Sequence, residues 1–240
     1  MDVSGSSQQR FAAFRHAAYA RYFASRFLTT FASQIVSVAV GWQIYDLTRD
    51  PFDLGMVGLV QFAPALLLVL VTGSVADRFG RRRIASLATG LEALCAAAIL
   101  GLTLYGMSSP LPVFAILFVF GIARAFYGPA AGALVANLVP EEDFANAVAW
   151  NTSAWQTATI VGPVAGGLLY GLSASTAYAT AIVFFASAAL LFLAIPDPAQ
   201  HTETERPSLS TVFAGFRYVW SEKIVLGAIS LDLFAVLLGG

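Results

Sequence analysis

Long apolar stretches alternate with short polar connections along most of the chain. Within each stretch the apolar residues follow one another directly, as in residues 65–71, whereas a strand of a membrane barrel alternates apolar and polar positions. An α-helix of about 20 apolar residues crosses the hydrocarbon layer and satisfies its own backbone hydrogen bonds there. The pattern predicts an all-α polytopic membrane protein whose six complete spans lie near residues 23–46, 54–76, 84–107, 112–138, 145–171 and 175–195.

The segments outside these spans differ from them in composition. Residues 1–22 lack a continuous apolar core and form a predicted tail, and residues 23–195 form the six-span unit. Residues 196–223 are a polar linker whose second half repeats apolar residues at three- and four-residue steps, which predicts either an amphipathic helix on the inner leaflet or an extension of the next span. Residues 224–240 form an apolar run shorter than about 20 residues, so we expect a truncated seventh span.

The composition excludes several classes of protein. Of the 240 residues, 58% are hydrophobic and 11% are charged, whereas about a quarter of an ordinary soluble domain is charged. A soluble enzyme and a disordered chain are therefore excluded, and the lipid bilayer is the expected surrounding. The formal net charge of -1 argues against a nucleic-acid partner, because phosphate backbones bind basic surfaces. Cys95 is the only cysteine, so no intrachain disulfide can form.

Basic residues are distributed unevenly among the connections. The N-terminal tail has three, the connection after the second span has four, and the segment after the sixth span has three. The connections on the other side contain one, Arg49. Because cytoplasmic loops carry the excess of lysine and arginine, we expect a cytoplasmic N-terminus and a multi-pass protein of the cell's inner membrane.

The connection between the second and third spans contains more than basic residues. An aspartate ends the preceding span and can pair with arginine, and Gly80 permits the positive φ that a short reversal often needs. The residues concerned are Gly73, Asp77, Arg78, Gly80, Arg81 and Arg82. This segment resembles motif A of the major facilitator superfamily, with Val75 where leucine is usual. The resemblance implies close packing at Gly73, a basic flank at Arg82, and a cytoplasmic latch between transporter halves formed by the aspartate and the other arginines.

The fourth span contains a charged residue, Arg124, four residues before Gly128. A charge inside a span costs about 2.5–3.5 kcal/mol on insertion scales and is expected to face protein or water. It either satisfies carbonyls at the kink near Pro129 or has a functional role. The spacing resembles motif B of the same superfamily, with Tyr127 where glutamine is common. The resemblance implies that the arginine takes part in proton coupling or binds a charge of the substrate.

The fifth span combines small residues with a proline. Ala158, Gly162 and Gly166 are spaced four apart and leave one helix face smooth, and Pro163 bends the helix. Ordinary helix packing explains such a face. Together with Gly167, however, the segment resembles motif C, which the family associates with export. Because the resemblance offers this face no partner within the six spans, we expect a missing half to cover it.

The three motifs occur in order and at matching spans, so the resemblance covers essentially the whole chain. It implies the six-helix N-terminal half of the major facilitator fold, built from two inverted three-helix repeats around a midplane cavity, followed by the truncated seventh span. Residues 42–48, 216–219 and 231–233 are similar to the branch of drug and siderophore exporters. The missing C-terminal half, or a second copy of the chain, would complete the transporter.

The resemblance therefore implies a secondary active transporter rather than an enzyme. We expect export of an amphipathic small molecule, a drug or a siderophore, by proton antiport and without a cofactor other than the proton. An importer of the same superfamily is the alternative. No Walker motif indicates an ATP-driven pump. An intramembrane protease is disfavoured because His16 and His201 lie outside the predicted spans, and a channel has no evident use for the latch motif.

Polar side chains within the spans are candidates for the wall of the cavity. Gln34 belongs to a polar stripe on the first span, and its amide needs hydrogen-bond partners. Asn151, Trp155 and Gln156 on the fifth span are candidates for the same reason, and for Gln156 contact with a neighbouring helix is the alternative. Arg26 is near the inner end of the first span, so we expect its long side chain to extend to the membrane surface.

Two carboxylates lie inside predicted spans, Glu92 in the third and Asp232 in the seventh. Burial disfavours the ionised form of a carboxyl group, so an intramembrane acid is suited to carrying protons. Either residue is a candidate for proton coupling. For Glu92 the alternative is a fixed ion pair with an arginine such as Arg124.

Overall fold

Six long helices and two short 3₁₀ segments make up the part of the chain that the structure describes. The structure is a computed structural model that describes residues 11–196. The elements in chain order are η1 (Ala12–Arg15), α2 (Ala17–Thr48), α3 (Pro51–Phe79), α4 (Arg81–Tyr105), α5 (Leu111–Leu134), η2 (Val135–Asn137), α6 (Glu141–Leu172) and α7 (Ala174–Leu193). The described residues contain no strand, as the all-α prediction requires. The predicted linker, its amphipathic helix, the seventh span and Asp232 lie outside the described residues.

Local signals in the sequence set several helix ends. Asp50 accepts a hydrogen bond from the N–H of Phe52 at the start of α3, and Ser173 accepts one from the N–H of Thr176 at the start of α7. Such caps satisfy backbone donors that the first turn of a helix leaves free. α3 and α4 meet at Gly80, whose φ is 89°. The short reversal between these helices therefore uses the positive φ that glycine adopts at low cost.

The first long helix begins earlier than residue 23, the start of the first span that the hydrophobic pattern predicts. α2 starts at Ala17, because its first two turns have their own buried face. Tyr19 and Tyr22 are fully buried, and they belong to an apolar cluster that includes Leu134 and Phe192. The part of the chain assigned to a tail thus contains the first turns of the helix bundle.

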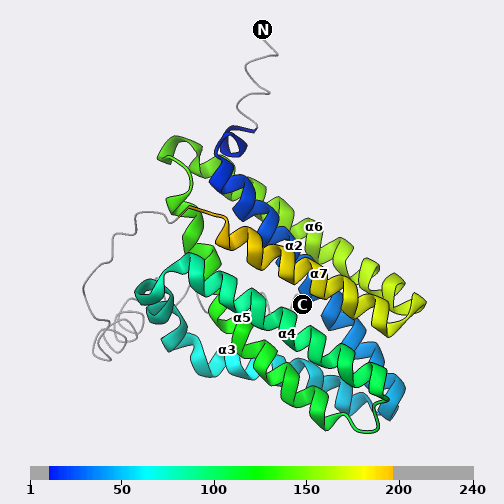
Figure 1. Ribbon diagram of the computed structural model, residues 1–240. Helices are drawn as coiled ribbons and strands as arrows, with labels where there is room; N and C mark the ends of the chain where they lie inside the picture. The colour runs from blue at the N-terminus through cyan, green and yellow to red at the C-terminus, as the bar shows by residue number, and fades with distance from the viewer. Residues whose placement is uncertain (1–10, 197–240) are drawn as a thin grey trace, which may run out of the picture. The chain divides into compact units, whose positions relative to one another are not determined.

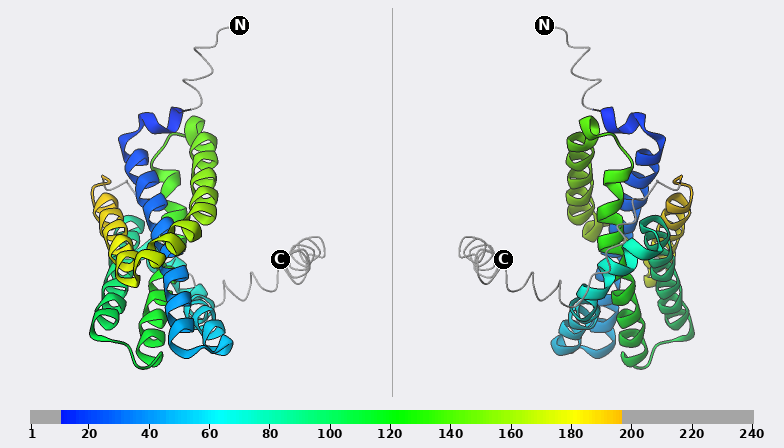
Figure 2. Two further views of the ribbon diagram at one scale, coloured as in Figure 1. Left: turned by 90° about the vertical axis from the view of Figure 1, so that its right-hand side faces the viewer. Right: turned by 90° about the vertical axis from the view of Figure 1, so that its left-hand side faces the viewer.

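The helices pack in a definite set of pairs. α2 lies against both α6 and α7, α4 lies against α5 and α7, and α3 packs mainly on α5 (Figure 1). The side views show α6 running beside α2 (Figure 2). A second apolar cluster fills the bundle further along α2 and includes Ile35, Ile99 and Phe185. Tertiary packing of these faces fixes the helices relative to one another.

Two of the helix pairs approach closely at glycines. A Cβ atom added at Gly162 of α6 would lie 2.6 Å from the Cβ of Gln34, and one at Gly166 would lie 3.1 Å from the Cα of Ile35. Similarly, a Cβ at Gly121 of α5 would lie 2.4 Å from the carbonyl oxygen of Gln61 on α3. The expectation that the smooth face of α6 has no partner within the six spans is therefore wrong. That face packs on α2, since the two glycines let the helix backbones approach.

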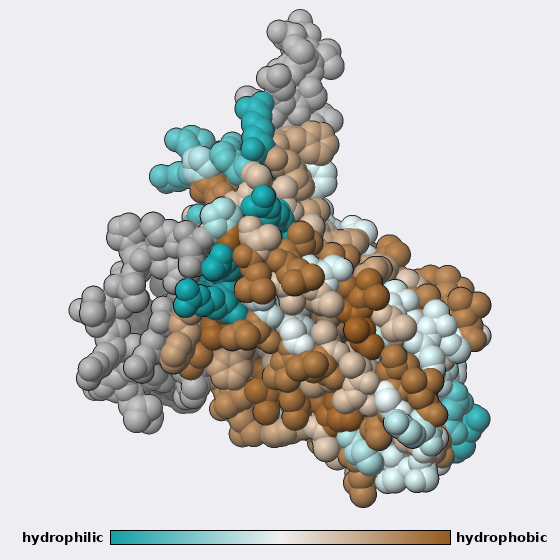
Figure 3. All heavy atoms as spheres, in the orientation of Figure 1, coloured by the Kyte–Doolittle hydropathy of each residue, from teal (hydrophilic) through white to brown (hydrophobic). Residues whose placement is uncertain are grey.

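The surface of the bundle is largely apolar. Five helices are long and apolar enough to cross a membrane by length and composition: α2, α4, α7, the segment Pro51–Leu68 of α3, and Leu111–Asn137. α6 is as long as α2 but is not among these five, because its first half is rich in acidic, amide and hydroxyl side chains. In the face shown in Figure 3, hydrophobic residues cover most of the helix surface and the most hydrophilic ones gather towards the ends of the bundle.

Candidate functional site

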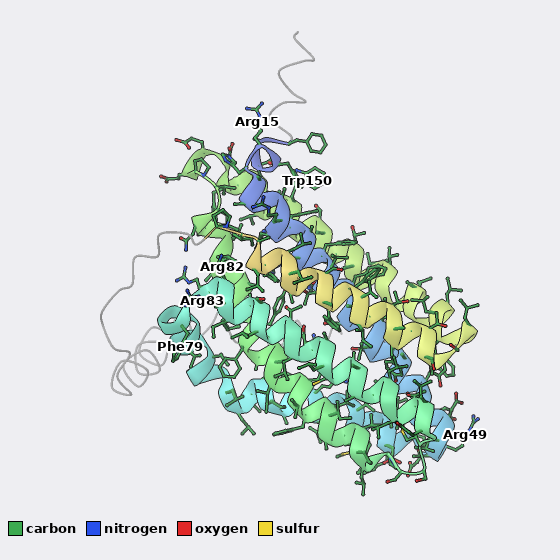
Figure 4. The ribbon with its side chains drawn as sticks, in the orientation of Figure 1. Arg15, Arg49, Phe79, Arg82, Arg83 and Trp150 are labelled. Carbon is green, nitrogen blue, oxygen red and sulfur yellow. The ribbon has the colours of Figure 1, made fainter. Side chains whose placement is uncertain are left out.

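Several arginines gather at one end of the bundle and bind the carboxyl ends of helices. Arg81 donates from Nη1 to the carbonyl oxygen of Ala133 near the end of α5, at 3.1 Å. Arg82 donates to the carbonyl oxygens of Leu193 and Ile195 at the end of α7. Cations at these positions satisfy carbonyls that the last turn leaves free and interact favourably with the helix dipole. Figure 4 shows Arg82 and Arg83 at this end and Arg49 at the opposite end.

The starts of α2 and α6 meet at the same end. His16 Nε2 and Asp143 Oδ2 are 2.8 Å apart, and the N–H of Ala13 donates to Asn146 Oδ1 at 3.2 Å. Phe11 and Phe14 of the N-terminal segment contact the ring of Trp150 on α6. The His16 ring is thus held by a carboxylate at this end of the bundle.

The motif A residues are only partly described. Gly73 lies in α3, and a Cβ added there would meet nothing within 4 Å among the described atoms, so the close packing expected at this glycine is not found there. Arg81 and Arg82 bind helix ends, as above. Asp77 and Arg78 are in the last turns of α3, but their side chains lie outside what the structure describes. The latch between two halves therefore stays a prediction.

The motif B arginine and the predicted coupling acid differ sharply in burial. Glu92 on α4 is fully buried, and neither of its carboxylate oxygens has a hydrogen-bond partner within residues 11–196. Arg124 on α5 is exposed, and its charge is the one that acts on Glu92 electrostatically. No ion pair joins the two among the described residues, so the alternative of a fixed pair is not found. Gly128 faces open space.

A groove between α2, the end of α5 and α6 brings together two of the predicted cavity residues. We call it the Arg26 groove. Its volume is about 380 Å³. Its lining residues are Tyr22, Arg26, Gly132, Val135, Phe144, Val148, Asn151, Thr152 and Trp155. Asn151 and Trp155, which the sequence singled out, therefore share one site. Gln34 is not part of it, since the stem of its side chain covers Gly162.

Arg26 itself was not expected in this site. Its Nη1 donates to the hydroxyl oxygen of Tyr22 at 2.9 Å, and the Tyr22 hydroxyl in turn donates to the carbonyl oxygen of Ala131 at 2.9 Å. The arginine therefore lines the groove, and its guanidinium reaches back to Tyr22, one turn nearer the start of α2. Its extension to the membrane surface stays a prediction. The spacing of four between Tyr22 and Arg26 was the available signal, because it places both side chains on one helix face.

A second groove of about 380 Å³ lies further along α2, against the start of α3. Its lining residues are Ser37, Val38, Gly41, Trp42, Tyr45 and Leu54. It includes Ser37 and Gly41, which lie on the same helix as Gln34, but no charged side chain. Among residues 11–196 no group of three histidine, cysteine, aspartate or glutamate side chains could hold a metal ion.

Comparison with known proteins agrees with this architecture. The sequence model of the Major Facilitator Superfamily matches residues 22–240. Similar proteins include those named Enterobactin exporter EntS of Shigella boydii serotype 18 (strain CDC 3083-94 / BS512), Escherichia coli O1:K1 / APEC and Escherichia coli O157:H7 (strain EC4115 / EHEC). Each is 28% identical to this chain over 225 residues, which cover 88% of this chain and 51% of the relative. The chain spans about half the length of these relatives.

Proposed function

The chain belongs to the major facilitator superfamily, and we propose that it works in a secondary transporter that exports an amphipathic small molecule of the drug or siderophore kind. The relatives named as enterobactin exporters support this direction and this class of substrate. The segment of α6 around Pro163 resembles the motif that the family associates with export, and it supports the same direction.

The Arg26 groove is the observation that carries this proposal. It combines a cation, an amide and aromatic rings beside apolar side chains, all within one recess of a membrane protein. Ligand sites are concave and mostly apolar, with a few polar groups that fix the orientation of the ligand. An amphipathic molecule meets both kinds of surface there, whereas a small inorganic ion would leave the aromatic rings unused.

Glu92 is our proposed carrier of the coupling proton. An ionised carboxylate is costly to bury without partners, and taking up a proton removes the charge that burial penalises. The Glu92 oxygens have no partner within the described residues, so the side chain does not serve as a structural hydrogen-bond acceptor there. The positive charge of Arg124, on the neighbouring helix α5, acts on Glu92. We therefore propose that Arg124 influences when Glu92 takes up and releases the proton.

We further propose that a second six-helix half covers the exposed side chains of Arg124 and Trp155. Arg124 is exposed on α5, which is apolar enough to cross a membrane, and Trp155 is exposed on α6. A charged side chain within a span faces protein or water rather than lipid. The second half is either further sequence of a longer chain or a second copy of this one, and the two halves would move against each other around a shared site.

Everted membrane vesicles test the proposal. The chain, and the longer gene product wherever the reading frame continues past Gly240, would be produced in a bacterial host without its own drug exporters. We expect uptake of an amphipathic dye when the vesicle interior is acidified, and loss of that uptake after addition of a protonophore. Uptake that survives the protonophore contradicts proton antiport, and absence of uptake from the longer product contradicts the proposal as a whole.

A further inference from the structure

We propose that the Arg26 groove selects anionic aromatic compounds, with the acid group of the ligand on Arg26 and its ring against Trp155. This inference rests on the proposed transport function and names the chemical class of substrate at the same site. It is carried by the charge of the groove, by the way the arginine is held, and by the exposed rings around it.

The charge of the groove is positive and has one source. Arg26 is the one charged residue among the side chains that line it. None of the carboxylates whose side chains the structure describes forms an ion pair with Arg26, and the side chain that it does bind is the uncharged phenol of Tyr22. A partly buried guanidinium without a carboxylate partner favours an anion, which supplies the missing charge.

The guanidinium is held in place with most of its donors free for a ligand. A guanidinium has five N–H donors, and the bond to the Tyr22 hydroxyl uses one of them. Tyr22 is itself fixed, because it is fully buried and donates to the Ala131 carbonyl. The remaining donors match the two oxygens of a carboxylate or a sulfonate. The guanidinium of Arg26 loses little conformational entropy when a ligand binds, because the hydrogen bond to Tyr22 already holds it in place.

Asn151 adds a neutral polar contact on the opposite wall. Asn151 is 8% exposed. The Tyr19 hydroxyl donates to the Ala147 carbonyl oxygen at 2.9 Å, and its oxygen lies 3.5 Å from Asn151 Oδ1. An amide NH₂ group has two N–H donors, so that of Asn151 is suited to a second oxygen of the same ligand.

Aromatic rings and an open floor complete the site. Trp155 is 49% exposed and Phe144 is 38% exposed, although both line the groove. Aromatic side chains are favourable partners for a flat ligand ring. Gly132 lines the floor, where an added Cβ would meet nothing within 4 Å. A flat ring thus has both a surface to pack on and room to enter.

Two fluorescent probes separate charge from shape. The probes are 8-anilinonaphthalene-1-sulfonate, an anion, and N-phenyl-1-naphthylamine, its neutral analogue without the sulfonate. Binding to the purified chain in lipid nanodiscs would be measured by probe fluorescence, with empty nanodiscs as the blank. We expect saturable binding of the anion at least about tenfold tighter than that of the neutral probe, which corresponds to one charge-assisted contact. A preference below threefold overturns the proposal, and this measurement needs no variant.

Substitutions then assign the preference to particular residues. Arg26→Gln should remove most of the preference for the anion and leave the affinity for the neutral probe unchanged, whereas Arg26→Lys should keep part of it. Arg49→Gln at the other end of α2 is the matched control and should change neither. An Arg26→Gln variant that is folded and keeps the anion preference overturns the proposal.

A steric variant covers the case in which Arg26→Gln does not fold. Gly132→Leu fills the floor of the groove and should abolish saturable binding of both probes, while Gly101→Leu on α4, also in open space, should not. Unchanged binding to Gly132→Leu overturns the proposal. Anion binding without any transport would contradict the proposed function and leave this inference standing, whereas transport indifferent to Arg26→Gln and to ligand charge would contradict only this inference.

Discussion

Glu92 combines full burial with two carboxylate oxygens that have no hydrogen-bond partner within residues 11–196. A side chain kept for stability alone would be better replaced by an apolar residue of similar size, since buried ionisable groups are costly. Its buried position on α4, with the charge of Arg124 acting on it, is suited to a group that changes its protonation during the transport cycle.

Glu92→Gln should abolish proton coupling while the protein stays folded. Glutamine has nearly the same shape and cannot ionise, so we expect gradient-driven dye transport to fall about tenfold or more, within the usual range of coupling energies between linked sites. Probe binding in the Arg26 groove should not change. Glu142→Gln, an exposed acid in the first turn of α6, is the control and should transport normally. Full gradient-driven transport by Glu92→Gln would exclude this role.

Single residues also show which features of the groove can be predicted from sequence patterns and which cannot. Asn151 and Trp155, which the sequence analysis named as candidates, both line the Arg26 groove, and their role in binding stays a prediction. Arg26 was not predicted as a residue of the groove, because the general tendency of arginine to extend to the membrane surface says nothing about the Tyr22 hydroxyl one turn away. The position of Gln34 was also not predictable, since it depends on which helix lies against Gly162.

At the scale of helices, the spans were predicted well and their partners were not. Apolar length determines a span, so five of the six predicted spans correspond to helices apolar enough to cross a membrane. Pairing depends on shape. The small-residue face of α6 packs on α2, and Gly121 of α5 packs on α3, although no motif distinguished this glycine. A family resemblance does not predict these contacts, because it assigns motifs to a fold but does not specify which side chains pack against each other.

Gly162→Leu should lower the free energy of unfolding by about 1–3 kcal/mol, the usual cost of overpacking. The new side chain would collide with the Cβ of Gln34 and push α6 away from α2. Gly167→Leu lies in the same motif but has open space, so it should have little effect. Cys95 is buried and is the only cysteine, so a thiol-reactive dye reports unfolding on heating. Equal melting curves for the two variants would contradict the close α2–α6 contact.

Arg82→Gln should destabilise the end of α7 by about 1 kcal/mol, because it removes charge-assisted hydrogen bonds to two carbonyls at that end. Arg82→Lys should keep part of the stability, since it retains the charge but not the planar fork. Arg49→Gln is the control, because its pair with Asp46 is exposed and contributes little. The same thiol assay measures the unfolding of all three variants. An unchanged melting curve for Arg82→Gln would show that water satisfies the carbonyl groups at the end of α7.

In the molecule as a whole, hydrogen bonds gather several basic residues at one end of the helix bundle. Arg21, Arg81 and Arg82 all bind the carboxyl ends of α5 or α7, and His16 pairs with Asp143 at the start of α6. The sequence assigned these segments to one side by counting arginine and lysine. The structure gathers them at one end for an independent reason, the satisfaction of helix ends. Which end faces the cytoplasm stays a prediction from the positive-inside rule.

Cysteine labelling decides the orientation. In a Cys95→Ala background, Phe79→Cys and Tyr105→Cys place single thiols at the two ends, since Phe79 ends α3 at the basic end and Tyr105 ends α4 at the other. Both positions are well exposed, so a difference in labelling reports sidedness rather than burial. A membrane-impermeant maleimide should label Tyr105→Cys in intact cells and label Phe79→Cys only after permeabilisation. The reverse result would invert the topology, and it would place the arginine-bound helix ends outside the cell despite the excess of basic residues there.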